Sequence, residues 1–494
     1  MLPSHPIFTC EQARQFEAEL FAGNEAAEWP AMQRAGSAIG EAVLRDFLEI
    51  GGFRPDGRVL VLAGKGHNGG DALIAAHAVL ERFPAASADV VFAFGERMLR
   101  PLAARSWREL HQRHPTRVRV RPTLEGKDER YELCLDGVFG FQFRPPVTSE
   151  IGELLARANA LPVRLRAAVD LPSAGLFRAD FTYATGAVKT PARAAEAGRL
   201  RYLDLGFFSG RSNPHADIPE RVLTPALLAP LAELRPAACD KRTFGNVFLL
   251  GGSRGYPGAI QMAALAALKS GAGLVTAFVP ESLAAAYAAR WPEIMWVGWP
   301  ETPHGALSLE GRHLFEQRVT RASSLVIGPG LGREPETLAL VRDIVSRSKV
   351  PLVLDADALQ PEIVSAGSAP RVFTPHAGEF LRIGGGRDAV AFAQDSGGTL
   401  VLKGPTTRVF VGKIAYHSLA GGPVLARGGS GDLLAGLIGG LLAQTPDEPA
   451  LAAARGVVWH GLAADALARA HGQTAVRITQ LVDYLAPSLR QLPA

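Results

Sequence analysis

The chain has 494 residues, of which 47% are hydrophobic and 20% charged, and this composition is typical of a globular protein with more than one domain. Its 52 basic and 48 acidic residues leave a formal charge of only +4 and are scattered along the sequence, which argues against a nucleic-acid partner. No apolar run reaches the roughly 18 residues that a membrane span needs, and the N-terminus lacks the pattern of a signal peptide, so we expect a cytoplasmic protein without a membrane partner.

The first half of the sequence predicts strands that alternate with helices. The expected helices cover residues 10–21, 31–51, 71–83 and 100–114, and the expected strands cover 58–64, 88–95, 131–140 and 166–173. Short apolar runs that end in glycine or aspartate are typical of buried strands, and such an alternation builds a parallel sheet that is covered on both faces. We therefore predict a Rossmann-like, three-layer α/β/α domain over residues 1–210.

A proline-rich stretch without regular strand spacing follows at residues 211–236, and we predict that it is a linker. Strands and helices then alternate a second time. The expected segments are residues 246–253, 259–273, 274–280, 323–332, 351–359, 371–380 and 399–412. A second three-layer α/β/α domain is therefore predicted over residues 237–494.

A glycine-rich segment, RGGSGDLLAGLIGG at residues 427–440, leads into an apolar run with helical spacing and carries Asp432 at the junction. Glycines before a helix let the backbone approach a ligand closely, and the free N–H groups of a helix N-terminus bind anions such as phosphate. Asp432 beside a bound phosphate would act as general base for a hydroxyl that attacks it. An aspartate at this place often only caps its helix, so both interpretations stay open.

Polar side chains follow other predicted strands of the first half, where ligands bind in open parallel sheets. The segment AGKGHNGGDA at residues 63–72 fits neither the dinucleotide nor the P-loop fingerprint, yet its glycines are compatible with a phosphate or pyrophosphate cradle. Asn68, Asp136 and Asp170 together offer oxygen ligands for a hard cation, although any one of them alone is more typical of a turn or a cap.

Glycine-rich turns also follow successive predicted strands of the second half, at residues 251–259, 328–332, 374–380 and 402–407. Within them, Lys403 is a natural partner for phosphate, and His376 is a polar group that can grip an amide or a ring. Either residue alone is more often structural. Their joint occurrence with a glycine-rich anion site favours a functional role.

The motifs of the two halves, in this order, resemble a known family that covers nearly the whole chain. They are MQRAG, VLVLAGKGHNGGDALIAA, LDGVFG and VDLPS in the first half, and FGNVFLLGGSRGYPGA, IGPGLG, VLDADAL, TPHAGEF, VLKGPTT and GGSGDLLAGLI in the second. The family is that of the bifunctional NAD(P)H-hydrate repair enzymes, in which an epimerase domain precedes a nucleotide-dependent dehydratase domain.

For the N-terminal domain the resemblance implies interconversion of R- and S-NAD(P)HX, which are nicotinamide cofactors hydrated at C6 of the ring, with the help of potassium. Asn68, Asp136 and Ser173 would line the potassium site, and Asp170 would take part in catalysis. The residues implied to hold the substrate are His67, Asn68, Gly69, Gly70, Asp71, Gly140, Phe141, Gln142, Phe143, Arg144, Pro145, Pro146 and Asp170.

For the C-terminal domain the resemblance implies a ribokinase-like fold and dehydration of S-NADHX or S-NADPHX to NAD(P)H, AMP and phosphate, with ADP or else ATP as co-substrate and with Mg2+. Asp432 would take the C6 hydroxyl proton while the glycines cradle the phosphoryl group. The substrate contacts would be Ala259, Gly330, His376 and Asp432, and the nucleotide contacts Lys403, Gly404, Pro405, Thr406, Thr407 and Gly431. We also expect a homo-oligomer whose other partners are small molecules.

The sequence departs from the family pattern mainly in its N-terminal domain. HNGGD replaces NNGGD at residues 67–71, GFQ replaces GTG at residues 140–142, and DLPSAGLFRAD shortens the usual DxPSGLDxxTG, whereas Ser430 keeps the hydroxyl of the usual threonine. Two other hypotheses stay open. The chain could be a ribokinase-like kinase of a small molecule such as a vitamin precursor, or its N-terminal domain could be a non-catalytic binding or scaffolding module.

Overall fold

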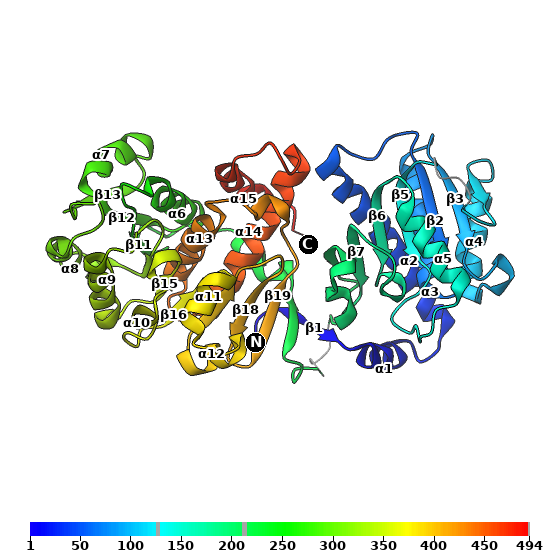
Figure 1. The fold of residues 1–494 in the computed structure, drawn as a ribbon, viewed down its shortest axis with the longest axis horizontal. Helices are drawn as coiled ribbons and strands as arrows, with labels where there is room; N and C mark the ends of the chain where they lie inside the picture. The colour runs from blue at the N-terminus through cyan, green and yellow to red at the C-terminus, as the bar shows by residue number, and fades with distance from the viewer. Residues whose placement is uncertain (125–128, 210–214, 493–494) are drawn as a thin grey trace. The chain divides into compact units, whose positions relative to one another are not determined.

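The computed structural model describes residues 1–124, 129–209 and 215–492, and the chain divides into two compact units (Figure 1). The N-terminal unit consists of His5–Asp217 with Ala468–Gln473, and the C-terminal unit consists of Met1–Ser4, Ile218–Leu467 and Thr474–Ala494. Within the described part of the chain, no helix combines the length and the apolar character needed to cross a membrane.

The N-terminal unit is built on a parallel sheet with strand order β4-β3-β2-β5-β6-β7-β9, and β1 pairs separately with β8. The strands are β1 Ser4–Phe8, β2 Arg58–Ala63, β3 Ser87–Phe92, β4 Val118–Val120, β5 Tyr131–Gly137, β6 Val163–Val169, β7 Phe181–Thr185, β8 Val188–Lys189 and β9 Arg199–Leu203. The helices are α1 Cys10–Phe21, α2 Glu25–Phe47, α3 His67–Arg82, α4 Pro101–Arg113 and α5 Ser149–Ala160.

The alternation of side chains along β2 creates the two hydrophobic layers of this unit. Val59 and Val61 point to one face of the sheet, where they pack with apolar residues of α2, α3 and α4. Leu60 and Leu62 point to the opposite face and pack with residues of α5. Because successive side chains of a strand point to opposite faces, a run of apolar residues buries both faces at once, as the continuous hydrophobic sequence predicts.

The C-terminal unit contains a sheet with strand order β13-β12-β11-β14-β15-β16-β17-β18-β19-β10, in which only the pairs made by β18 are antiparallel. Its strands are β10 Glu220–Leu223, β11 Asn246–Leu250, β12 Leu274–Pro280, β13 Met295–Trp299, β14 Ser324–Ile327, β15 Leu352–Leu354, β16 Arg371–Phe373, β17 Thr399–Leu402, β18 Thr407–Val411 and β19 Ile414–Ser418. Its helices are α6 Pro257–Lys269, α7 Glu281–Arg290, α8 Arg312–Glu316, α9 Pro335–Arg347, α10 Pro361–Val364, α11 Ala377–Gly384, α12 Ala389–Ser396, α13 Ser430–Gln444, α14 Pro449–His471 and α15 Leu485–Arg490.

The predicted fold class, two three-layer α/β/α domains, is confirmed, and two local predictions need correction. The helix expected at residues 71–83 begins at His67, so Gly69 and Gly70 lie in its first turn. Gly69 lies so close to the backbone of Gly64 that a Cβ there would be 2.1 Å from the Gly64 carbonyl oxygen. The predicted linker at 211–236 contains β10, which pairs in parallel with β19. Four residues are too few to show a strand period, and residues 211–214 lie outside the described part of the chain.

We predict that Gly436→Ala destabilises the C-terminal unit. A Cβ at Gly436 would lie 1.9 Å from the carbonyl oxygen of Ala263, so α13 and α6 would have to separate. Overpacking of this kind lowers the free energy of unfolding by about 1–3 kcal/mol, which thermal unfolding of the full chain can measure. Gly258→Ala in α6 is the control, because nothing lies within 4 Å of its added Cβ. Equal melting temperatures for the two variants would contradict this packing.

Candidate functional site

A cavity of about 700 Å3 lies in the N-terminal unit, beyond the carboxyl ends of β2, β5 and β6. Its lining includes most of the residues predicted to hold the substrate of this unit: His67, Asn68, Gly69, Asp71, Gly140, Phe141, Gln142, Phe143, Arg144, Pro146 and Asp170. Gly70 and Pro145 are not among the residues that line it. A Cβ at Gly70 would lie 2.0 Å from Cε of Met32, so this glycine serves the packing of α3 on α2.

Of the residues that depart from the family pattern, His67, Phe141 and Gln142 line this cavity. The rings of Phe139 and Phe143 pack with their centroids 4.3 Å apart, and the Nζ atom of Lys189 lies 5.1 Å from the centroid of the Phe141 ring. The Nε2 atom of His67 lies 3.4 Å from the carboxyl group of Glu28. With these bulky side chains in place, the volume still falls within the roughly 300–1,000 Å3 that is typical of small-molecule sites.

A buried ion pair connects Lys189 to Asp170 at the cavity. Their Nζ and Oδ1 atoms are 2.7 Å apart, both side chains are almost completely buried, and Lys189 also donates to the carbonyl oxygen of Thr185. Buried charges persist only when they are paired and hydrogen-bonded, so each residue requires the other. Lys189 was not among the site residues predicted from the sequence. Its strand, β8, has only two residues, and a single lysine within the apolar segment GAVKT was the available signal.

Of the further carboxyl groups that line the cavity, those of Glu17 and Asp71 interact electrostatically with this ion pair. Burial raises the pKa of Glu17, which lies on α1, to about 7, and the Lys189 ammonium opposes this rise. Burial, reinforced by the carboxylates of Asp170 and Glu17, raises the pKa of Asp71 well above its ordinary range. Both groups therefore keep their protons to a higher pH than an exposed carboxyl group would.

The predicted potassium residues come together on one side of this cavity. Asp136 is fully buried and accepts hydrogen bonds from the Ser173 hydroxyl at 2.6 Å and from the Ser173 N–H at 2.8 Å. The side-chain amide of Asn68 donates to the carbonyl oxygens of Val169 and Phe139 at 2.9 and 3.3 Å, so these two oxygens point to one place. A cluster of carboxylate, carbonyl and amide oxygens fits a hard cation, provided that Asn68 turns its own oxygen inward.

In the C-terminal unit, the glycine-rich segment forms the N-terminus of α13, as predicted. Gly429 precedes the helix with a φ of 93°, a conformation that favours glycine, and no side chain caps the helix. The helix begins at Ser430, which places Asp432 at its third residue. The interpretation of Asp432 as the helix cap is therefore wrong. The Ser430 N–H donates to the carbonyl oxygen of Arg427 at 3.3 Å, so the N–H groups of Gly431 and Asp432 are the ones that can bind an anion.

Asp432 and Lys403 lie together at this helix N-terminus. Burial, with the nearby carboxylate of Asp355, raises the pKa of Asp432 to about 7, while the Lys403 ammonium opposes this rise. Burial lowers the pKa of Lys403, but the carboxylates of Asp355 and Glu379 outweigh this effect, so the pKa is raised and the ammonium stays charged. A base that titrates near neutral pH thus stands beside a permanent cation, which is the arrangement that proton abstraction requires.

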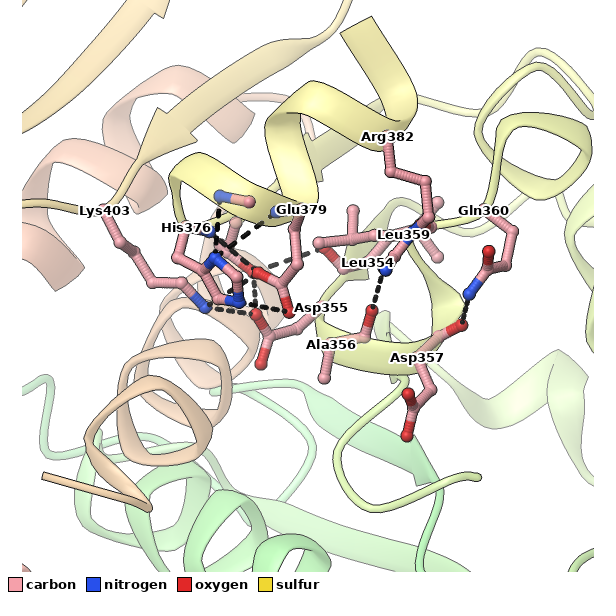
Figure 2. A network of polar contacts seen from close by, with 12 residues as sticks. Leu354, Asp355, Ala356, Asp357, Leu359, Gln360, His376, Glu379, Arg382 and Lys403 are labelled. Atoms are coloured by element: carbon pink, nitrogen blue, oxygen red, sulfur yellow. Dashed lines mark hydrogen bonds and ion pairs between the residues drawn. The ribbon is translucent and has the colours of Figure 1, made fainter. Parts of the chain in front are cut away.

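Lys403 is held by two carboxylates that the sequence analysis did not select. Figure 2 shows Lys403 pointing toward Asp355 and Glu379, at 2.8 and 3.8 Å from their oxygens. Asp355 follows β15 and also accepts a hydrogen bond from the hydroxyl of Thr374 at 2.7 Å. A Cβ at Gly431 would lie 3.0 Å from Nζ of Lys403, so this ammonium lies against the start of α13. The motif VLDADAL was the signal for Asp355.

The other residues predicted for this unit lie at the same strand ends. Gly330 is next to Ala259, because a Cβ at Gly330 would lie 3.0 Å from the Ala259 Cβ. His376 has a structural role that its sequence did not reveal, since its Nδ1 atom caps α11 by accepting from two backbone N–H groups. Gly404, Pro405 and Thr406 connect β17 to β18, and Thr407 is the first residue of β18. Their roles in binding a ligand stay predictions.

Both units match known families. A family model described as NAD(P)H-hydrate dehydratase matches residues 247–487, and one described as YjeF-related protein N-terminus matches residues 30–195. Among solved structures, a ribokinase-like superfamily protein of Enterococcus faecalis has a TM-score of 0.48 and 31% identity, and covers 55% of this chain and 96% of its own. The ADP/ATP-dependent NAD(P)H-hydrate dehydratase of Bacillus subtilis, co-crystallised with ATP and Mg2+, has a TM-score of 0.45 and 27% identity, and covers 52% and 93%.

Two curated relatives match nearly the whole chain. The bifunctional NAD(P)H-hydrate repair enzyme Nnr of Moorella thermoacetica is 34% identical over 499 residues, which are 93% of this chain and 92% of the relative. The enzyme of the same name from Gloeobacter violaceus is 36% identical over 516 residues, which are 97% of this chain and 96% of the relative. The order of the motifs, the two α/β/α units and these full-length matches agree. The chain therefore belongs to the family of bifunctional NAD(P)H-hydrate repair enzymes.

Proposed function

We propose that the C-terminal unit dehydrates S-NADHX and S-NADPHX with ADP or ATP, and that the N-terminal unit interconverts the R and S hydrates. The observation that carries this proposal is the position of Asp432, a buried carboxyl group with a pKa of about 7, beside Lys403 at the uncapped N-terminus of α13. Membership of the family supports both activities and disfavours a small-molecule kinase. The buried charges of the N-terminal cavity support a catalytic N-terminal unit rather than a scaffold.

The chemistry of the C-terminal unit follows from these groups. Asp432 removes the proton from the C6 hydroxyl as this oxygen attacks the terminal phosphoryl group of the nucleotide. Lys403 and the first N–H groups of α13 stabilise the negative charge that develops on the phosphoryl oxygens. Phosphate is a better leaving group than hydroxide, so the N1 lone pair expels it as the C6–O bond breaks. Loss of a proton from C5, which the departing phosphate can accept, then forms the C5=C6 bond and restores the dihydropyridine.

Mg2+ would enter with the nucleotide and supply positive charge at its phosphate oxygens. The carboxylates nearest to this place are already engaged, because Asp355 accepts from Lys403 and Asp357 accepts from Arg333 at 2.8 Å. These carboxylates therefore do not offer a free metal site, and the phosphates themselves would hold the ion. The preference for ADP or ATP, a homo-oligomeric state and a cytoplasmic location stay predictions.

We predict that Asp432→Asn lowers the turnover of dehydration by about 10² to 10⁴, the usual contribution of a positioned general base. Affinity for ADP or ATP should be at least as high as in the original chain, because a negative charge beside the phosphates is lost. The absorbance of NAD(P)H formed from purified S hydrate measures the rate, and calorimetry measures nucleotide binding. Asp447→Asn, which changes an exposed carboxylate of the same unit, is the matched control.

The same variant should be more stable than the original chain at pH 8. The folded-state pKa of Asp432 is raised from 3.8 to about 7, so the folded protein loses stability as pH rises through this range and the carboxyl group ionises. Asparagine removes this loss, and the melting temperature should rise. Normal turnover together with an unchanged melting temperature would remove Asp432 from the proposed mechanism.

For the N-terminal unit, we predict epimerisation that requires potassium and is lost in Asp136→Asn. The substitution removes the one carboxylate of the predicted ion site and retains its size, so K+ would lose its charged ligand. Chromatographic separation of the R and S hydrates over time gives the rate in KCl and in NaCl. Asp56→Asn, at an exposed position of the same unit, should keep the cation dependence. Equal rates in both salts for the original chain would refute the potassium assignment.

A further inference from the structure

The N-terminal cavity holds carboxyl groups beyond its buried ion pair. Lys189 and Asp170 are 2.7 Å apart and neutralise each other. Asp71, on α3, and Glu17, on α1, line the same cavity and add two carboxyl groups, and the Lys189 ammonium acts on both. The Oδ1 atom of Asp71 is buried and has no hydrogen-bond partner in the described structure, and the same holds for Oδ2 of Asp170. Buried oxygens of this kind need a hydrogen-bond donor, and a polar ligand or a water molecule in the cavity would supply one.

Several other charged side chains that line this cavity interact with partners of their own. The Arg14 guanidinium pairs with Glu11 on the same helix, and Glu28 pairs with His67 at 3.4 Å. The Lys65 ammonium lies 5.3 Å from the centroid of the Phe94 ring. Arg100 and Arg144 also line the cavity, but Lys189 is the cation that acts on both Glu17 and Asp71. Burial raises the pKa of both carboxyl groups, and Glu17, whose pKa is raised to about 7, can gain or lose its proton near neutral pH.

The proposed epimerisation needs groups of this kind, and the inference rests on that proposed function. The hydroxyl of the hydrate is on C6, next to the ring nitrogen N1, so the lone pair of N1 can expel it. Hydroxide leaves poorly, whereas water leaves readily once an acid supplies a proton. Water must then add to the other face of C6, and a base must accept a proton from it. Two carboxyl groups from different elements can supply the acid and the base.

We propose that Glu17 and Asp71 are the acid–base pair of the N-terminal cavity. The Lys189–Asp170 ion pair lies at the same cavity and stays ionised while they exchange protons. One protonated carboxyl group donates its proton to the C6 hydroxyl, the C6–O bond breaks with its electron pair on oxygen, and water leaves. The N1 lone pair forms the N1=C6 bond. A water molecule adds to the opposite face, returns the electron pair to N1 and gives its extra proton to the other carboxylate. No oxidation occurs, and one water leaves while one enters.

Glu17→Gln in the full chain tests this assignment. The rate of R to S interconversion, measured without nucleotide and corrected for the spontaneous rate, should fall by about 10² or more. Asp71→Asn should give a loss of the same order. In the original chain the rate should change as pH passes through about 7, where Glu17 exchanges its proton, and Glu17→Gln should lack this feature. Glu19→Gln, at an exposed position of the same helix, should behave as the original chain does.

Dehydration of S hydrate by the C-terminal unit and the melting temperature show whether each variant is folded. A folded Glu17→Gln variant with the rate and pH profile of the original chain would overturn the assignment of Glu17 and leave the epimerase function standing. If the original chain itself fails to exceed the spontaneous rate in KCl, the epimerase function is wrong and the acid–base assignment is wrong with it. Partial activity of Glu17→Asp, which keeps the carboxyl group on a shorter side chain, would support a chemical rather than a packing role.

Discussion

The ion pair between Lys403 and Asp355 fixes the position of the positive charge at the candidate site of the C-terminal unit. Asp355 is 1% exposed, and a carboxylate buried so deeply persists only with a cation and hydrogen-bond donors, which Lys403 and Thr374 provide. The ammonium is thereby fixed against the start of α13. Burial, reinforced by the carboxylate of Asp355 and opposed by the Lys403 ammonium, raises the pKa of Asp432 from 3.8 to about 7. This change corresponds to roughly 4 kcal/mol, since one pKa unit is about 1.4 kcal/mol. It outweighs the 0.3–1 kcal/mol by which a helix N-terminus typically stabilises a carboxylate.

The N-terminal unit also contains a buried ion pair, and this pair affects the protonation of neighbouring carboxyl groups. Here Lys189 and Asp170 form the buried pair, and two more carboxyl groups share the cavity with them. Burial raises the pKa of Glu17 to about 7 and the pKa of Asp71 above its ordinary range, and the Lys189 ammonium opposes both shifts only in part. Each unit thus holds a carboxyl group that can gain or lose a proton near neutral pH: Asp432 lies beside a cation, which suits phosphoryl transfer, and Glu17 lines the cavity in which a hydroxyl group would leave.

The sequence allowed the prediction of features that are continuous along the chain. The apolar runs located most strands, and the glycine-rich turns located the N-terminus of α13 and singled out Asp71 and Asp432, although α3 begins four residues before its predicted start. Residues that reach a site from short or distant elements escaped prediction. Lys189 lies on a two-residue strand, and Glu17 lies on α1 without any motif around it. The strand β10 escaped because four residues in a proline-rich stretch show no period, and its pairing with β19 is a tertiary interaction.

The pH dependence of kcat/KM for S-NADHX, measured at saturating nucleotide, tests the central claim most directly. If Asp432 is the general base and titrates at about 7, its carboxylate form is required. The value should then reach a plateau above pH 8 and fall by about tenfold for each pH unit below 7. A profile that stays flat from pH 8 down to pH 5 would show that no group with this pKa accepts the hydroxyl proton, and it would contradict the account.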